Sequence, residues 1–129
     1  MSFSVDAILV RSPIRFLQDE IAQRRFLEGV VVAVMYFERF GSDRIEEYFK
    51  SKSVPSAPVN IQNLKVQTIA KMLEGFGLID HRVHSLMGEV CQVRNDVVHK
   101  LRDPDAIDEH QAREAIEKAI ECLKALGCS

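Results

Sequence analysis

Apolar residues recur every three or four positions along almost the whole chain, as they do on the buried face of an α-helix. No run alternates apolar and polar residues for long enough to form a half-buried β-strand. The pattern therefore predicts an all-α protein, a compact up-and-down bundle of four to five helices. The chain has 129 residues, of which 47% are hydrophobic and 28% charged, so residues 1–129 are expected to form a single domain around one core.

Capping residues, prolines and glycines predict where the helices begin and end. Ser12-Pro13 combines a side chain that caps helix N-termini with a proline at the first helical position, and Gly41 suits a helix terminus. We therefore expect one long first helix between these points. The later elements expected are a short helix capped by Ser42 or Asp43, a mobile loop over 51–58, a helix from Asn60 to Gly75, a helix capped by Asp80, and a closing helix that starts at Asp103-Pro104 and ends at Gly127.

The first expected helix is apolar around more of its circumference than one small core requires. Its sequence is nearly continuously apolar between Val30 and Phe37. Part of this surface is therefore expected to face another subunit, which favours a homodimer. We interpret the stripe formed by Phe26, Val30, Val34 and Phe37 as core and dimer surface rather than as a cradle for a ligand.

The overall charge and the cysteines exclude several classes of protein. A net charge of −2 and a pI near 6.1 argue against a protein that coats nucleic acid through bulk electrostatics, so any contact with RNA would be local. Cys91, Cys122 and Cys128 form neither an even set nor a C-x2-C pair, which favours reduced thiols. The sequence shows no export signal and no apolar run that could span a bilayer, so we expect a soluble, cytoplasmic protein that contacts no membrane.

The segment Arg94-Asn95-Asp96-Val97-Val98-His99 places a fixed cation near a titratable imidazole. Arginine matches phosphate oxygens with a planar fork, and histidine exchanges a proton near neutral pH, so the pair suits cleavage of a phosphodiester. On one helix, however, five residues separate the two side chains by about 140° around the axis and about 7.5 Å along it. The spacing therefore favours a dimer, in which a twofold axis lines one cleft with both pairs.

These six residues, late in the penultimate helix of a small helical chain, resemble the R-x4-H signature of the HEPN domain family (higher eukaryotes and prokaryotes nucleotide-binding). The resemblance implies a metal-independent ribonuclease without a cofactor, with its active site at a homodimer interface and a role as a toxin or in stress or defence. It implies that His99 is the acid/base group, that Arg94 binds the scissile phosphate, and that Asn95 orients a phosphate or the partner imidazole. Attack by a ribose 2′-hydroxyl would restrict cleavage to RNA and spare DNA.

The resemblance leaves the partner and the activity open. Some toxins of the family carry a tyrosine two residues after the motif histidine, where a nucleotidyltransferase antitoxin attaches nucleotides, but here that residue is Leu101. Control by such an antitoxin is a further expectation, but leucine at this position argues against control by this modification. The alternative is a non-catalytic HEPN module that binds a nucleotide, RNA or a partner protein.

Each of these residues also has a purely structural interpretation. Arg94 could form an interhelical ion pair with Glu28 or Glu38, and His99 could cap the carboxyl end of its helix. Asp96 is expected to pair with Lys100 rather than orient His99. We interpret His81 and His84 as a surface pair, because the sequence shows no clear third metal ligand near them. Arg24-Arg25 is expected to form a solvated face. Cys91 is expected to be a small buried apolar residue.

Overall fold

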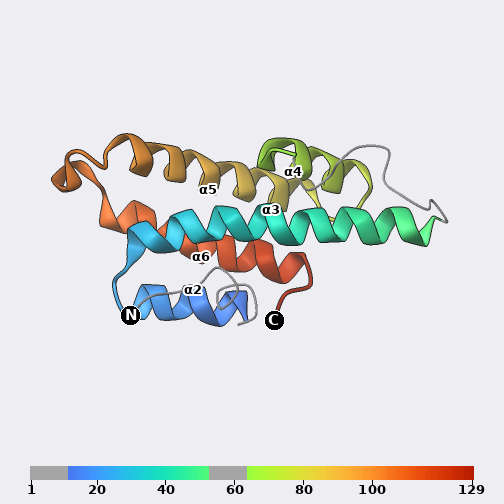
Figure 1. Ribbon diagram of the computed structural model, residues 1–129, viewed down its shortest axis with the longest axis horizontal. Helices are drawn as coiled ribbons and strands as arrows, with labels where there is room; N and C mark the ends of the chain where they lie inside the picture. The colour runs from blue at the N-terminus through green and yellow to red at the C-terminus, as the bar shows by residue number, and fades with distance from the viewer. Residues whose placement is uncertain (1–11, 53–63) are drawn as a thin grey trace.

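The computed structural model describes residues 12–52 and 64–129 (Figure 1). The regular secondary structure of this part of the chain is entirely helical, with no strand, so the all-α prediction is confirmed. The elements are α2 (Pro13–Ala22), α3 (Phe26–Ser51), α4 (Val66–Gly75), α5 (His81–His99), a 3₁₀ turn η2 (Pro104–Ala106) and α6 (Glu109–Ala125). The expected loop over 51–58 lies outside the described residues except for Ser51, which ends α3, and Lys52. The expected helix start at Asn60 also lies outside them. However, Leu64 and Lys65, which the prediction places in this helix, are not helical, and α4 begins at Val66.

The long helix α3 is the centre of the bundle and packs against α2, α4, α5 and α6 (Figure 1). α5 lies along one side of α3, α2 lies along the other, and α6 runs behind them and contacts α2, α3 and α5. The core between these helices is built from fully buried side chains, including Leu17, Val30, Phe37, Leu73, Met87 and Ile116. The short helix α4 covers the carboxyl-terminal half of α3 beside the start of α5, and this arrangement shapes the candidate site.

The expected long first helix is two helices, because the chain turns sharply at Arg24. Arg24 has a φ of 57°, in the left-handed region that residues other than glycine, asparagine and aspartate rarely adopt. The turn is closed by the Arg25 amide, which donates to the Glu20 carbonyl at 2.8 Å. Both arginines are exposed but ion-paired, Arg24 with Glu109 and Arg25 with Glu20, each at 3.1 Å. The prediction that Arg24 and Arg25 form a solvated face is therefore only partly right, because both side chains are exposed but each pairs with a glutamate.

The prediction that the first helix ends near Gly41 is wrong, since α3 continues to Ser51 and includes the short helix expected after Ser42. Gly41 is buried where α3 meets α4. A Cβ atom on Gly41 would lie 2.6 Å from Cγ2 of Ile69, closer than real Cβ contacts allow. The glycine therefore permits close packing of two helices rather than ending one.

Gly41→Ala is expected to destabilise the protein by about 1–3 kcal/mol, because the branched Ile69 side chain is stiff at χ1 and cannot move aside freely. Gly88→Ala is the matched control. Gly88 lies in α5 with open space around its Cα, so alanine should stabilise the helix by up to about 1 kcal/mol. Unfolding in denaturant measures both values, and a Gly41→Ala protein as stable as the native chain would contradict this packing.

The other helix ends agree with the sequence in part. The Ser12 hydroxyl accepts from the Arg15 amide, the Asp80 carboxylate accepts from the Val83 amide, and Gly127 has a φ of 91°, so these three predictions are confirmed. The predicted start of the last helix is wrong: residues 104–106 form only η2, and α6 begins at Glu109. There the Asp108 carboxylate accepts from the Gln111 amide, which makes Asp108 the capping residue.

The predicted dimer stripe on the first helix is also corrected by the fold. Val30, Val34 and Phe37 are fully buried within the chain, and Phe26 is nearly so, because α3 is surrounded by four helices. The apolar residues that α3 exposes are instead Val31 and Met35. Across the described ranges, 12–52 and 64–129, no helix is both long enough and apolar enough to cross a bilayer.

Candidate active site

Arg94, Asn95 and His99 lie in the last turns of α5, as the sequence predicted. Because α5 is continuous from His81 to His99, Arg94 and His99 keep a separation of about 140° around the axis and about 7.5 Å along it. One chain therefore presents the two side chains in different directions.

Arg94 and Asn95 line a cavity of about 520 Å³ that opens to solvent. Such a volume is within the range of about 300–1,000 Å³ that is usual for small-ligand sites. The residues around the cavity come from three helices and from the chain that enters α4: Glu38 of α3, Leu64 to Gln67, and Cys91, Arg94 and Asn95 of α5. His99 is not among them.

The Arg94 guanidinium is held by its neighbour rather than by an acid. Its Nε donates to Oδ1 of Asn95 at 2.9 Å, which fixes the direction of the fork. Glu38 lines the same cavity, but within the described part of the chain Arg94 forms an ion pair with neither Glu38 nor Glu28. The terminal amino groups of Arg94 are therefore available to an anion that enters the cavity.

His99 is exposed at the carboxyl end of α5. The last carbonyls of the helix, those of Asp96, Val97 and Val98, accept from the Lys100 amide. Within residues 12–52 and 64–129, the imidazole of His99 makes no hydrogen bond or ion pair, so it does not cap the helix. Its side chain is free to meet a substrate or a second copy of the chain.

The structure corrects the interpretation of Asp96. Its Oδ1 accepts a hydrogen bond from Nε2 of Gln92, one turn earlier, at 3.4 Å. Over the described ranges, Asp96 pairs with neither Lys100 nor His99. It therefore neither orients the imidazole nor forms the expected helical ion pair.

Cys91 lies one turn before Arg94 and is almost completely buried. Burial raises the pKa of its thiol and Glu38 raises it further, whereas Arg94 acts in the opposite direction. The thiol stays protonated at neutral pH, so Cys91 is a packing residue, as predicted, and not a nucleophile.

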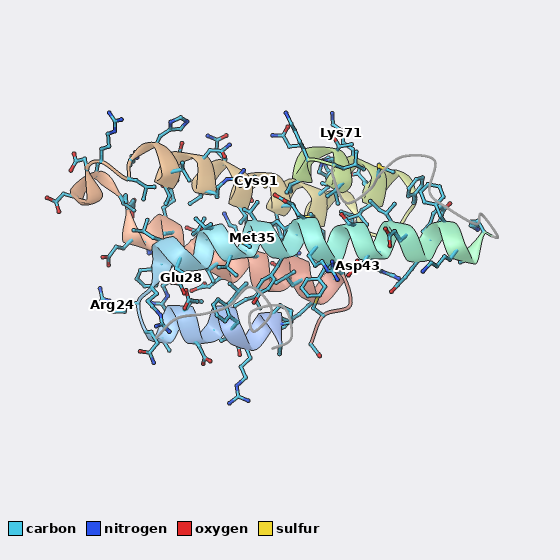
Figure 2. The ribbon with its side chains drawn as sticks, in the orientation of Figure 1. Arg24, Glu28, Met35, Asp43, Lys71 and Cys91 are labelled. Carbon is cyan, nitrogen blue, oxygen red and sulfur yellow. The ribbon has the colours of Figure 1, made fainter. Side chains whose placement is uncertain are left out.

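The most exposed large apolar side chains lie on α3 and at the end of α5, the two helices that carry Glu38 and Arg94. Val31 and Met35 of α3 and Val98 and Leu101 at the end of α5 are the large apolar residues that are most exposed in the described chain, at 37–56%. On α3, Met35 lies on the turn before Glu38, on the long helix that packs against α5 (Figure 2). On α5, Val98 lies one turn after Arg94 on the same side. We name Val31, Met35, Val98 and Leu101 the apolar rim.

Comparisons with known proteins do not assign the chain to a family. No protein-family model, no curated protein and no solved structure matches the chain.

Proposed function

We propose that the protein is a metal-independent endoribonuclease of HEPN type that acts as a homodimer in a toxin–antitoxin, stress or defence setting. The observation that carries the proposal is the Arg94 guanidinium, oriented by Asn95 and without an acidic partner in the described chain, at the mouth of a solvent-open cavity. His99, exposed on the same helix, supplies the titratable group.

The separation of Arg94 and His99 is the argument for a dimer. The two side chains diverge by about 140° on one helix, so Arg94 of one copy is expected to work with His99 of the other. The apolar rim supports this arrangement, because exposed large apolar residues on the two helices that carry Glu38 and Arg94 favour burial against a partner. A twofold axis near this face would bring both α5 ends into one cleft.

The proposed reaction needs only these groups and the RNA. The His99 imidazole accepts the proton of a ribose 2′-hydroxyl, and the 2′-oxygen forms a bond to the adjacent phosphorus. Arg94 stabilises the negative charge that grows on the phosphorane oxygens. The bond from phosphorus to the 5′-oxygen then breaks, and the protonated imidazole returns its proton to this oxygen, so that His99 ends neutral. The products are a 2′,3′-cyclic phosphate and a 5′-hydroxyl.

A non-catalytic module is the second candidate, favoured by the position of His99 outside the cavity of its own chain. In that case Arg94 and Asn95 would bind the phosphate of a nucleotide or RNA, or an acidic group of a partner protein, without turnover. For a nucleotidyltransferase partner, Leu101 offers an exposed side chain but no hydroxyl to modify.

Incubation of the native protein with labelled single-stranded RNA in EDTA tests the proposal. We expect fragments that end in a 2′,3′-cyclic phosphate, and no cleavage of DNA of the same sequence, which lacks the attacking hydroxyl. Intact RNA across several substrates, together with binding of those RNAs, would instead favour the non-catalytic module.

Met35→Asp is expected to weaken the dimer, because the partner would bury an unpaired carboxylate. Sedimentation velocity should show a monomer with native helical content at concentrations where the native chain is dimeric. Gln18→Asp, an exposed change on α2, is the control for added charge.

Val34→Asp should unfold the chain, since Val34 is buried in the core. A native chain that is monomeric throughout would refute the dimer.

A further inference from the structure

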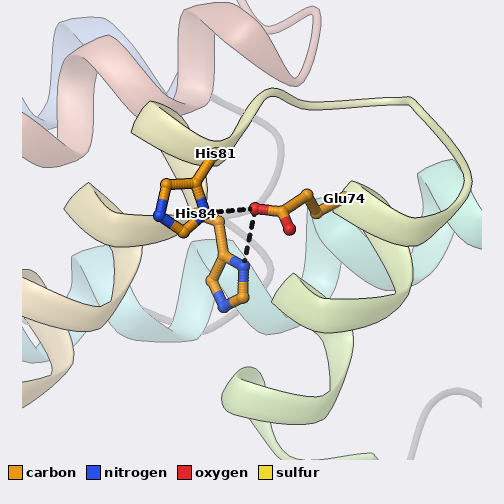
Figure 3. A group of neighbouring side chains, drawn as sticks. All are labelled: Glu74, His81 and His84. Atoms are coloured by element: carbon orange, nitrogen blue, oxygen red, sulfur yellow. Dashed lines mark hydrogen bonds and ion pairs between the residues drawn. The ribbon is translucent and has the colours of Figure 1, made fainter.

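A carboxylate and two imidazoles converge where α4 ends and α5 begins (Figure 3). Oε1 of Glu74, in the last turn of α4, lies 2.8 Å from Nδ1 of His81 and 3.2 Å from Nδ1 of His84. The two histidines occupy the first turn of α5, three residues apart, so they share one side of the helix. The three ligand atoms all lie within 4.8 Å of one another.

The turn between the two helices fixes this arrangement. Gly77 adopts a φ of 75°, and the Leu78 amide donates to the Leu73 carbonyl at 2.9 Å. Leu73 and Ile79, on either side of the turn, are buried in the core. The Asp80 side chain caps α5 immediately before His81. The three ligands are therefore placed by packed and hydrogen-bonded backbone rather than by a free loop.

We propose that Glu74, His81 and His84 form a Zn²⁺ site. Imidazole nitrogen and carboxylate oxygen are both ligands that zinc prefers, at about 2.0–2.2 Å from the ion, in tetrahedral geometry. Ligand atoms around such an ion lie about 3.3 Å apart. The 2.8 and 3.2 Å separations of Glu74 Oε1 from the two imidazoles are already close to this value. The ligand atoms of the group lie within 4.8 Å of one another, so the exposed His81 side chain has to turn toward His84 to complete the site. The ion takes the place of the hydrogens that the two imidazoles direct at Glu74. Each neutral ring then carries its hydrogen on Nε2 and binds the ion through Nδ1, and water completes the coordination.

The site is reachable from solvent and separate from the candidate active site. The side chains of His84 and Glu74 are about one-third exposed and that of His81 is largely exposed, so an ion needs no opening of the fold. Thirteen residues of α5, or about 20 Å, separate His81 from Arg94, so the ion does not contact Arg94. Zinc would join the last turn of α4 to the first turn of α5. The opposite end of α4, at Val66 and Gln67, lines the cavity beside Arg94. The proposal does not depend on ribonuclease activity.

Calorimetric titration of the metal-stripped full chain, without a histidine tag, with Zn²⁺ tests the site. We expect one ion per chain, binding weakened by about tenfold or more in His81→Ala and Glu74→Gln, and unchanged binding in the control His110→Ala, an exposed histidine on α6. Zinc should also raise the melting temperature of the native and control proteins but not of a His81→Ala/His84→Ala protein.

Titration with Co²⁺ gives a second readout that does not rely on variants. We expect the intense visible absorption of tetrahedral cobalt to saturate at one equivalent and to disappear when Zn²⁺ is added. Circular dichroism checks that the variants remain helical. Binding below one equivalent, or equal binding by the native and His81→Ala/His84→Ala proteins, would overturn the proposal.

Discussion

Substitution of His99 by alanine is expected to lower the rate of RNA cleavage by about 10²- to 10⁴-fold, the usual contribution of a positioned general acid or base. The side chain is exposed and its imidazole has no partner within residues 12–52 and 64–129, so the fold and its stability should not change. Cleavage of labelled RNA under single-turnover conditions measures the loss. His110→Ala, on the exposed face of α6, is the matched control.

Arg94→Ala should lower the same rate by about 10²- to 10³-fold, because the phosphorane loses its charged donor. Arg94→Lys retains the charge but not the planar fork, so it should recover only part of the rate. The exposed Arg15 of α2 offers a control, Arg15→Ala, which should cleave as the native chain does. If Arg94→Ala and His99→Ala both unfold, the two residues are structural and the catalytic assignment is wrong.

A second large effect is expected on stability, because Glu20 is a carboxyl group buried between α2 and α3. Its side chain is 1% exposed and accepts a hydrogen bond from Nε of Arg25. Burial raises the pKa of Glu20 from 4.5 to about 7, helped by a hydrogen bond and repulsion from Glu28, while Arg25 acts in the opposite direction. Burial also raises the pKa of the neighbouring Tyr36, to which the Glu20 charge contributes.

The sign of the pH dependence follows from this shift. Between pH 4.5 and about 7 the folded chain keeps a proton on Glu20 that the unfolded chain has released. The contribution of Glu20 to the free energy of unfolding is therefore fully present below pH 4.5. It is lost as the pH rises through about 7, and the loss is at most about 3 kcal/mol.

Glu20→Gln isolates this effect, since glutamine has the same shape and stays neutral. Denaturant unfolding should show the variant more stable than the native chain by about 1–3 kcal/mol at pH 8, with a much smaller difference at pH 4.5. Glu117→Gln, at an exposed ion pair on α6, should change little at either pH. An equal change of stability with pH in the native and Glu20→Gln proteins would show that Glu20 does not titrate in this range.

Local signals in the sequence predicted much of the fold. The caps at Ser12 and Asp80 and the glycine at 127 act within one turn of their own helix, so neighbouring residues are enough to recognise them. The break at Arg24 could not be predicted in this way, because arginine gives no sign that it will adopt a left-handed conformation. Gly41 misled for a similar reason: a glycine that ends a helix and one that admits a neighbouring helix look the same in sequence.

For the candidate sites too, the residues on one helix could be placed from the sequence, whereas most residues from other helices could not. Arg94, Asn95 and His99 belong to one helix, so their relative placement followed from helical geometry. Glu38, which lines the same cavity, was expected near Arg94 only as an ion-pair partner, and the start of α4, which completes the cavity, was not predicted. The third ligand beside His81 and His84 was missed as well, because only the turn after α4 brings Glu74 back to them.

One experiment asks directly whether Arg94 of one copy acts with His99 of the other. Arg94→Ala and His99→Ala chains are coexpressed with different tags, and the mixed dimer is isolated through both. We expect each variant alone to be inactive and the mixed dimer to cut RNA, at about half the native rate if the two sites are independent. A mixed dimer as inactive as either variant, beside a native protein that cuts the same RNA, would contradict a site shared between two copies.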